Sequence, residues 1–225
     1  MELPLLSEAG DVSGVRVLLR AGLNVPVKDG VVVNDFRIKK ALETIEYLRD
    51  HGAKVLIVSH LGREPSETLM PVYERFKQDI PGMLFARSFF NSETDGIVEA
   101  MQDGDVLLFE NIRSEEGEKN NDSDLSKRLA ELADIYVNEA FSVSHREHAS
   151  IVGVPSLIPG YAGLQLEHEV RELSKALTPI HPSLFIVGGA KFATKAPILR
   201  MALDKYETCF VGGALVNDFF KAKRL

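Results

Sequence analysis

The nine residues Val55-Leu56-Ile57-Val58-Ser59-His60-Leu61-Gly62-Arg63 are the most informative stretch of the sequence. They open with an uninterrupted aliphatic run, which is typical of a β-strand buried on both faces. The preceding residues 37–51 carry apolar side chains at three- and four-residue spacings, and Gly52 follows them. This spacing predicts an amphipathic helix with a glycine stop. A helix leading into a doubly buried strand indicates an α/β fold.

The same alternation recurs along the rest of the chain. Strands are predicted at Val15–Leu19, Val55–Ser59, Met83–Ala86, Val106–Phe109, Ile135–Val137, Leu184–Val187 and Thr208–Val211. Helices are predicted at Arg37–His51, Leu125–Ala133 and Leu166–Leu177, and the polar stretch Ser114–Asp124 is predicted to be an exposed loop. Strands that alternate with helices form βαβ units, so we expect a doubly wound, Rossmann-like parallel sheet with helices on both faces.

A proline-containing segment at 178–182 interrupts this pattern, because proline removes a backbone donor and restricts the residue before it. A new βαβ pattern follows, but the remaining residues are too few for an independent doubly wound domain. We therefore expect a complete domain at 1–178 and the first part of an incomplete second α/β domain at 179–225. Such a part would expose strand edges and apolar helix faces, so aggregation or partial disorder beyond Pro182 is predicted.

Composition excludes several classes of protein. The 225 residues include 26 Lys+Arg and 33 Asp+Glu, a formal net charge of −7, which argues against nucleic-acid binding. Apolar runs fall short of the ~18 residues of a membrane span, and the first residues lack the pattern of a signal peptide. The single cysteine, Cys209, cannot form an internal disulfide. These features predict a cytoplasmic protein with no membrane partner.

Basic side chains follow four of the predicted strands, where open α/β sheets bind their ligands. The polar residues at these positions are Arg20, Asn24, Ser59, His60, Arg63, Glu110, Asn111, Arg113, Asn138, Glu139, His145, Arg146 and His148. Arg37 opens the first long helix, whose N-terminus also favours an anion. Arginine binds phosphate and carboxylate bidentately, so this pattern predicts a site for a multiply charged anion. Solvated surface arginines are the alternative.

Two diglycine turns suggest a second phosphate site. Gly188-Gly189-Ala190-Lys191 lies between a predicted strand and a helix, and Lys195 is one helical turn further on. Glycines let a phosphate approach the backbone closely. Gly212 and Gly213 repeat this layout, and two such turns side by side could form the floor of a nucleotide site. Tight turns with solvated lysines are an equally good interpretation, since neither a P-loop nor a dinucleotide fingerprint is present.

Other candidate sites are weaker. His145 and His148 could form a metal pair, but no cysteine or carboxylate at matching spacing completes it, so no metal site is predicted. Asp134, Glu139 and Glu167 are expected to cap helices or to lie on the solvated surface. A nicotinamide-dependent dehydrogenase is disfavoured because the glycine fingerprint of that class is missing.

The chain resembles the phosphoglycerate kinase family, with motifs in matching order over essentially all 225 residues. The matching segments are Asn24-Val25-Pro26, Arg37-Ile38, Ser59-His60-Leu61-Gly62-Arg63, Glu110-Asn111-Ile112-Arg113, Tyr136-Val137-Asn138-Glu139-Ala140-Phe141, His145-Arg146-Glu147-His148-Ala149-Ser150 and Gly188-Gly189-Ala190-Lys191. The resemblance implies a two-domain, monomeric kinase that closes around the helix Leu166–Leu177. Its N-terminal domain would hold 3-phosphoglycerate or 1,3-bisphosphoglycerate, and its C-terminal domain Mg-ADP or Mg-ATP.

The resemblance also implies roles for individual residues. The implied phosphoglycerate ligands are Arg20, Asn24, Arg37, His60, Arg63, Arg113, His145, Arg146 and His148. Arg37 and Lys191 would act on the phosphoryl group during its transfer, and Lys195, Gly212 and Gly213 would contact the nucleotide. Phosphoryl transfer depends mainly on positioning and charge neutralisation, which basic side chains supply.

Three positions depart from the family pattern. Gly22 stands where the family usually has an aspartate that contacts the substrate hydroxyl, Ser142 replaces a glycine, and Thr194 replaces an aspartate. Family members are also nearly twice as long, and the missing part would carry the adenine pocket and the aspartate that holds Mg²⁺. The resemblance therefore implies a truncated kinase chain, with a catalytically inactive relative that binds a small phosphate as the alternative.

Overall fold

The computed structural model describes residues 3–224 and divides into two compact units. The first unit ends at Glu169 and the second begins at Val170, so the division falls within helix α5 (Leu164–Lys175). The domain boundary predicted at residue 178 stays a prediction.

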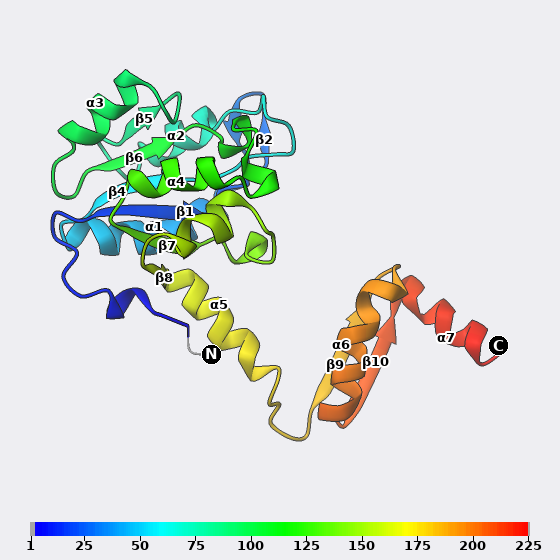
Figure 1. The fold of residues 1–225 in the computed structure, drawn as a ribbon. Helices are drawn as coiled ribbons and strands as arrows, with labels where there is room; N and C mark the ends of the chain where they lie inside the picture. The colour runs from blue at the N-terminus through cyan, green and yellow to red at the C-terminus, as the bar shows by residue number, and fades with distance from the viewer. Residues whose placement is uncertain (1–2, 225) are drawn as a thin grey trace. The chain divides into compact units, whose positions relative to one another are not determined.

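The first unit is built on one parallel six-stranded sheet with the strand order β5-β6-β4-β1-β7-β8 (Figure 1). Its strands are β1 (Arg16–Ala21), β4 (Lys54–Val58), β5 (Leu84–Ala86), β6 (Val106–Phe109), β7 (Ile135–Glu139) and β8 (Gly160–Ala162). From β1 the chain adds strands in one direction and then returns to add β7 and β8 on the other side of β1. This reversal defines a doubly wound sheet, as predicted.

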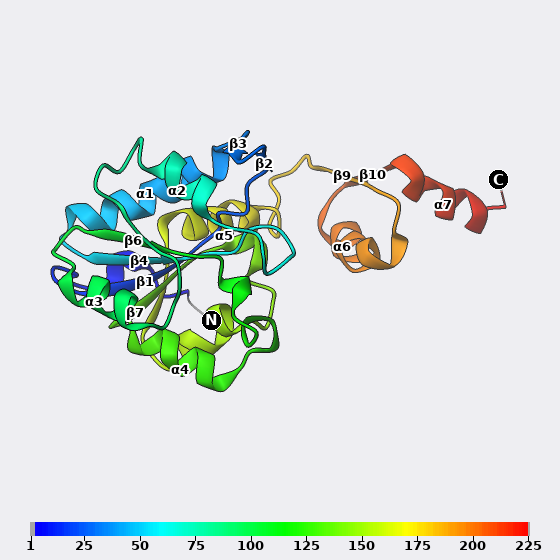
Figure 2. The ribbon, with the colours of Figure 1, turned by 90° about the horizontal axis from the view of Figure 1, so that it is seen from above.

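Helices cover both faces of the sheet. Figure 2 shows α1 (Phe36–Asp50) and α2 (Met70–Phe76) on one side, with α3 (Ser92–Ala100) and α4 (Ser123–Glu131) on the other. Successive strand residues alternate between two cores: Val17 and Leu19 pack on the α1 side, and Leu18 packs on the α4 side. All three are fully buried. This double burial explains why the strands read as continuous apolar runs.

Short elements complete the first unit. They are the hairpin strands β2 (Val27–Lys28) and β3 (Val31–Val32), the 3₁₀ turns η1 (Leu6–Glu8), η2 (Ile112–Ser114), η3 (Glu118–Asn120), η4 (Phe141–Val143) and η6 (Val154–Ser156), and the π turn η5 (Ala149–Gly153). Helix α4 starts two residues before its predicted start because Asp122 caps it, accepting hydrogen bonds from the backbone N–H groups of Asp124 and Leu125.

The prediction of an exposed loop over Ser114–Asp124 is wrong in part. The η3 turn lies in this segment, and Glu118 is only 1% exposed. Its carboxylate is accommodated because the backbone N–H and the hydroxyl of Ser150 donate to it. The prediction failed because Ser150 lies 32 residues away in the sequence, so local polarity gives no sign of the contact.

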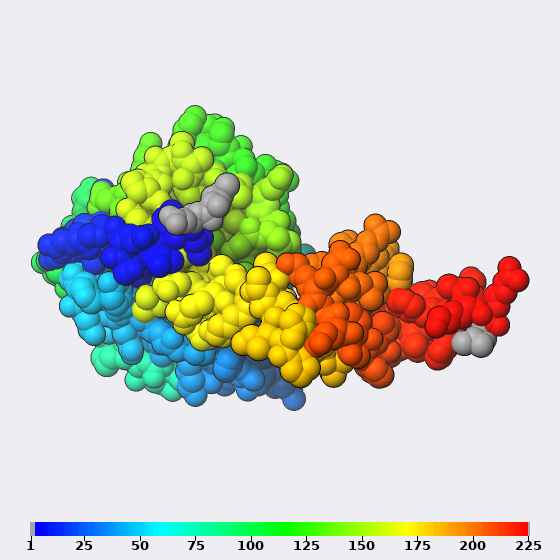
Figure 3. Space-filling view, turned by 90° about the horizontal axis from the view of Figure 1, so that it is seen from below, coloured from blue at the N-terminus to red at the C-terminus, as the bar shows by residue number. Residues whose placement is uncertain are grey.

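The first residues of the unit cover an edge of the sheet. Leu5 forms an isolated parallel bridge with Ala162 of β8, and the Ala162 N–H donates to the Pro4 carbonyl at 2.7 Å. Figure 3 shows the dark-blue N-terminal stretch on the surface of the first unit, next to the yellow-green residues. Within residues 3–224, no helix is long and apolar enough to cross a membrane.

The second unit contains the parallel pair β9 (Leu184–Gly188) and β10 (Thr208–Gly212), with α6 (Phe192–Lys205), η7 (Gly213–Leu215) and α7 (Val216–Ala222). Val187, Leu199 and Leu215 form its small core. Ile186 of β9 and Phe210 of β10 remain 67% and 58% exposed. The predicted aggregation beyond Pro182 therefore stays a prediction, with exposed apolar strand residues in its favour.

Candidate anion-binding site

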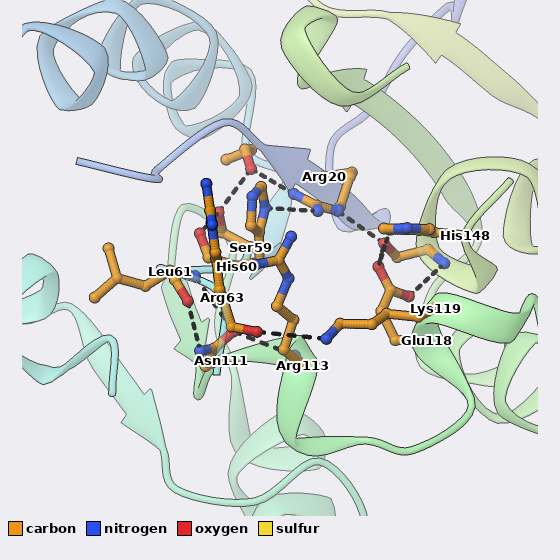
Figure 4. A network of polar contacts seen from close by, with 12 residues as sticks. Arg20, Ser59, His60, Leu61, Arg63, Asn111, Arg113, Glu118, Lys119 and His148 are labelled. Carbon is orange, nitrogen blue, oxygen red and sulfur yellow. Dashed lines mark hydrogen bonds and ion pairs between the residues drawn. The ribbon is translucent and has the colours of Figure 1, made fainter. Parts of the chain in front are cut away.

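The site lies where the central strands of the first unit end. Arg20 is the fifth residue of β1, His60 follows β4, and Arg113 lies in η2 after β6 (Figure 4). Two further segments supply Glu118 of η3 and His148, which precedes η5. The parallel arrangement thus brings together side chains that are far apart in the sequence. β1 was predicted to end at Leu19, before Arg20, and that boundary is wrong.

Arg20 is the centre of the cluster and is only 1% exposed. Its Nε donates to Ser150 Oγ at 2.8 Å and its Nη1 donates to the Ala21 carbonyl at 2.7 Å. Its Nη2 lies 3.1 Å from His60 Nδ1. Burial lowers the pKa of Arg20, while the negative charge of Glu118 opposes that shift. The guanidinium therefore remains a charged donor whose orientation three partners fix.

His60 is a neutral ring that accepts from Arg20 and can donate one N–H group to a ligand. Because Arg20 can only donate, the Nδ1 atom of His60 must accept, and the ring proton is assigned to Nε2. Burial, followed by the charge of Arg20, lowers the pKa of His60 to about 3. At neutral pH this ring can offer an anion one N–H group without adding positive charge.

Glu118 lies behind the cluster as its buried counter-charge. One oxygen, Oε2, accepts from the Ser150 N–H at 2.9 Å, and the other, Oε1, accepts from the Ser150 hydroxyl at 2.7 Å. His148 Nδ1 lies 3.5 Å from Oε1. Burial is the main cause that lowers the pKa of His148, and the Glu118 charge opposes it. Sequence reasoning missed both Glu118 and Ser150 as site residues, although Ser150 lies within one of the quoted motifs.

Buried polar side chains hold the loop after β4 in place. The Ser59 hydroxyl donates to the Ala21 carbonyl at 2.8 Å, and Asn111 Nδ2 donates to the Leu61 carbonyl at 3.0 Å. The Gly62 N–H donates to Asn24 Oδ1 at 2.9 Å. The side-chain oxygen of Asn24, a predicted ligand, is therefore occupied in shaping the loop, while the residue itself remains exposed.

The other predicted ligands are less buried than Arg20 and His60. Arg113 donates to the Gly62 carbonyl, and burial followed by the positive charge of Arg146 lowers the pKa of Arg113. Arg63 is exposed, and its carbonyl accepts from Lys119 at 3.4 Å. His145 is exposed and does not take part in the network of Figure 4.

Arg37 lies in a separate cavity of about 380 Å³, next to α5. Its walls include Gly22, Glu139, Ser142 and Gln165, so two of the positions that depart from the family pattern border it. A Cβ added at Gly22 would lie 3.5 Å from the Glu139 carbonyl oxygen, an ordinary van der Waals distance. The surrounding backbone therefore leaves room for a Cβ at this position.

Glu139 forms the buried wall of this cavity, and its role was only partly predicted. It was placed after a strand ending at Val137, but it is the last residue of β7 and is 6% exposed. Its Oε1 accepts from the Thr44 hydroxyl at 2.7 Å and from the Gln165 N–H at 2.9 Å, so it does cap the start of α5. Its Oε2 is buried without a partner within residues 3–224. Burial raises the pKa of Glu139 to about 7.

The diglycine turns of the second unit lie side by side. Gly188 pairs with Gly212 in register, and a Cβ added at Gly213 would lie 3.4 Å from the Gly189 nitrogen. Lys191 precedes α6 and Lys195 lies in its first turn, and both side chains are exposed. The phosphate site proposed at these turns from the glycine spacing stays a prediction.

Magnesium has no matching ligand set in the part of the chain that the structure describes. No group of three or more His, Cys, Asp or Glu side chains within residues 3–224 could hold a metal ion. Mg²⁺ prefers oxygen ligands from carboxylates and phosphates. The residues that the structure describes therefore do not supply such a ligand set for Mg²⁺.

Together, the fold and the cluster define a doubly wound α/β protein with basic side chains gathered at the carboxyl edge of its sheet. Its sequence is 41% identical over 219 residues to phosphoglycerate kinase of Fervidobacterium nodosum and 42% identical over 218 residues to that of Dictyoglomus turgidum, each covering 94% of this chain. The family model described as phosphoglycerate kinase matches residues 6–225, and the chain belongs to that family.

Solved structures agree with this assignment. Phosphoglycerate kinase from Coxiella burnetii matches with a TM-score of 0.88 and 36% identity, over 99% of this chain and 57% of the other. The enzyme from Pyrococcus horikoshii OT3 matches with the same TM-score and 27% identity, over 99% and 58%. The chain spans 55% of the length of each of the two curated relatives named above.

Proposed function

We propose that this chain is the phosphoglycerate-binding part of a phosphoglycerate kinase. The kinase would transfer a phosphoryl group reversibly between 1,3-bisphosphoglycerate and ADP, giving 3-phosphoglycerate and ATP in glycolysis. The observation that carries the proposal is the buried Arg20, held by His60 and Ser150 at the carboxyl edge of the sheet. Holding an arginine in this environment costs free energy, and a multiply charged anion is the ligand that such a group recognises best.

In this proposal the first unit binds the anion through Arg20, His60 and Arg113, with the less buried predicted ligands around them. Arg37 and Lys191 would neutralise charge on the phosphoryl group during transfer, since such transfer depends on electrostatic stabilisation. Lys195 and the turns at Gly212 and Gly213 would contact the phosphates of ADP or ATP. When bound with the nucleotide, Mg²⁺ would add further charge neutralisation. We extend the proposal to a monomeric, cytoplasmic protein.

A calorimetric titration of the 225-residue chain with 3-phosphoglycerate tests the proposal. We expect binding that weakens as ionic strength rises, because exposed arginines such as Arg63 contribute through screened attraction. The control ligand is glycerol, which lacks both anionic groups. A folded chain that does not bind 3-phosphoglycerate at low salt would contradict the proposed function.

Gly22 favours the alternative function, an inactive relative that binds a small phosphate. It lines the Arg37 cavity at the position where the family usually has aspartate. The Gly22→Asp variant separates the two functions, and its Cβ would meet the neighbouring backbone only at ordinary van der Waals distances. For a substrate half we expect 3-phosphoglycerate to bind roughly tenfold more tightly, the size of one hydrogen bond to its hydroxyl.

The matched control for this change is Gly96→Asp on helix α3, where an added Cβ meets no atom within 4 Å. It adds the same charge away from the site and is expected to leave affinity within about twofold. Inorganic phosphate has no hydroxyl-bearing carbon, so its affinity should not improve in Gly22→Asp. Equal tightening of both ligands would favour the small-phosphate relative.

A further inference from the structure

A buried acidic residue lies behind a site that should attract anions. Glu118 is 1% exposed, and its charge acts on both Arg20 and Arg113. A negative charge at this place repels any anionic ligand of the cluster. Its burial also costs free energy unless the carboxylate is paired and hydrogen bonded. Glu118 must therefore supply something that offsets both effects.

The direction of the hydrogen bonds shows what it supplies. A carboxylate can only accept, so the Ser150 hydroxyl must direct its single hydrogen to Glu118 Oε1 at 2.7 Å. The lone pairs of Ser150 Oγ are then left to accept from Arg20 Nε at 2.8 Å. The second carboxylate oxygen binds the Ser150 backbone N–H, which prevents the serine from turning away. Figure 4 shows the labelled Glu118 and Arg20 at the two ends of this chain of contacts.

Arg20 is thereby held in one orientation. Three of its five N–H bonds go to Ser150, Ala21 and His60, and two remain for a ligand. We propose that Glu118 is a positioning residue, which acts through the Ser150 hydroxyl to fix the Arg20 guanidinium for the anionic substrate. This inference rests on the proposed function for the identity of that substrate. The ordering of Arg20 itself does not depend on it.

The direction in which a Glu118 substitution changes anion affinity distinguishes a positioning role from simple charge repulsion. Removing the Glu118 charge alone should tighten anion binding, since a repulsive charge is lost. If Glu118 orients Arg20, Glu118→Gln should instead weaken it. The glutamine has the same shape, but it has one acceptor oxygen and an NH₂ group that can only donate, so it cannot accept from both the hydroxyl and the backbone N–H of Ser150.

The experiment compares Glu118→Gln and Ser150→Ala with Glu116→Gln, whose exposed side chain lies two residues away. In the two network variants we expect 3-phosphoglycerate to bind roughly tenfold more weakly, and in Glu116→Gln within about twofold of the unmodified chain. Nitrogen-15 NMR of the Arg20 Nε–H group gives a readout without ligand. Its hydrogen exchange should accelerate in both network variants and stay unchanged in Glu116→Gln.

The double variant Glu118→Gln/Ser150→Ala tests whether the two residues act through one contact. We expect it to bind no more weakly than the weaker single variant, whereas unrelated structural damage would add. Tighter binding in Glu118→Gln, or unchanged Arg20 exchange, would overturn the inference. If the unmodified chain does not bind 3-phosphoglycerate but Arg20 exchange still accelerates, the proposed function fails and the positioning role stands.

Discussion

Replacing Arg20 by methionine is expected to destabilise the chain by about 3–5 kcal/mol, the usual cost of breaking a buried charge pair from one side. The variant keeps most of the side-chain volume but removes the buried positive charge that is joined to Glu118 through the Ser150 hydroxyl, and we call Arg20 and Glu118 the buried pair. It also leaves His60 Nδ1 without its donor, while the Ala21 carbonyl keeps only the hydrogen bond from the Ser59 hydroxyl. Relief of the repulsion from Arg113 and Arg146 offsets only part of this cost.

Urea denaturation of the 225-residue chain, followed by circular dichroism, measures the effect. The control is Arg63→Met, because Arg63 is exposed and lies outside the buried pair. It should change the free energy of unfolding by no more than about 0.5 kcal/mol. Adding Glu118→Gln to Arg20→Met should recover about 1–3 kcal/mol, since the unpaired buried charge is then removed. Equal costs for Arg20→Met and Arg63→Met would contradict the buried pair.

The sequence predicted the doubly wound sheet because its strands are buried on both faces. Val106–Phe109 was predicted residue for residue, since turns flank its apolar run. Helix α3 and strand β8 were not predicted. Helix α3 is short and contains Gly96, and β8 is the three-residue segment Gly160–Ala162, so neither carries a strong periodic signal.

The predicted strand ends were wrong where the strand finishes with a charged residue. Arg20 and Glu139 were both placed beyond their strands, because a charged side chain inside a buried strand is rare. Each is tolerated through contacts that come from distant parts of the chain. Ser150 lies 130 residues from Arg20, and Thr44 lies 95 residues from Glu139. Such pairs cannot be found from local pattern, although Arg20 and Glu139 themselves were among the polar residues singled out after the strands.

The sequence therefore predicts the ligand-facing residues of the site better than the residues that support them. It named the basic residues that face the proposed ligand, because their position after apolar runs is a local feature. It did not name Glu118, which supports them from behind and was placed in an exposed loop. Residues that orient a ligand-binding group need only complement that group, so no ligand chemistry marks them in the sequence.

Replacing Glu139 by glutamine is expected to change how stability depends on pH. Burial raises the pKa of Glu139 from 4.5 to about 7, against the opposing hydrogen bonds from Thr44 and Gln165, and the nearby Glu43 adds to the rise. A group whose pKa is higher in the folded chain stabilises it fully below the unfolded value. That stability is lost as the pH rises through about 7. The shift corresponds to about 3 kcal/mol between pH 4.5 and pH 8.

The measurement is the difference in unfolding free energy between the unmodified chain and Glu139→Gln from pH 5 to pH 8. This difference removes the titration of His60, which has the opposite sign because its pKa is lowered and which occurs in both proteins. We expect the unmodified chain to lose stability relative to the variant as pH rises. The unpartnered Glu139 Oε2 explains the direction, since an ionised carboxylate there lacks a donor.

The control for this prediction is Glu46→Gln, which replaces an exposed glutamate on helix α1, and the difference for Glu139→Gln should vary with pH more strongly than that of this control. The glutamine at 139 leaves its amide group buried against Gly163, so a constant offset is expected at every pH and does not affect the test. A flat difference for Glu139→Gln would mean that this carboxyl titrates alike in the folded and unfolded chain. Glu139, which caps α5, would then be ionised at neutral pH. Its Oε2 atom would need a hydrogen-bond donor that the described residues do not supply.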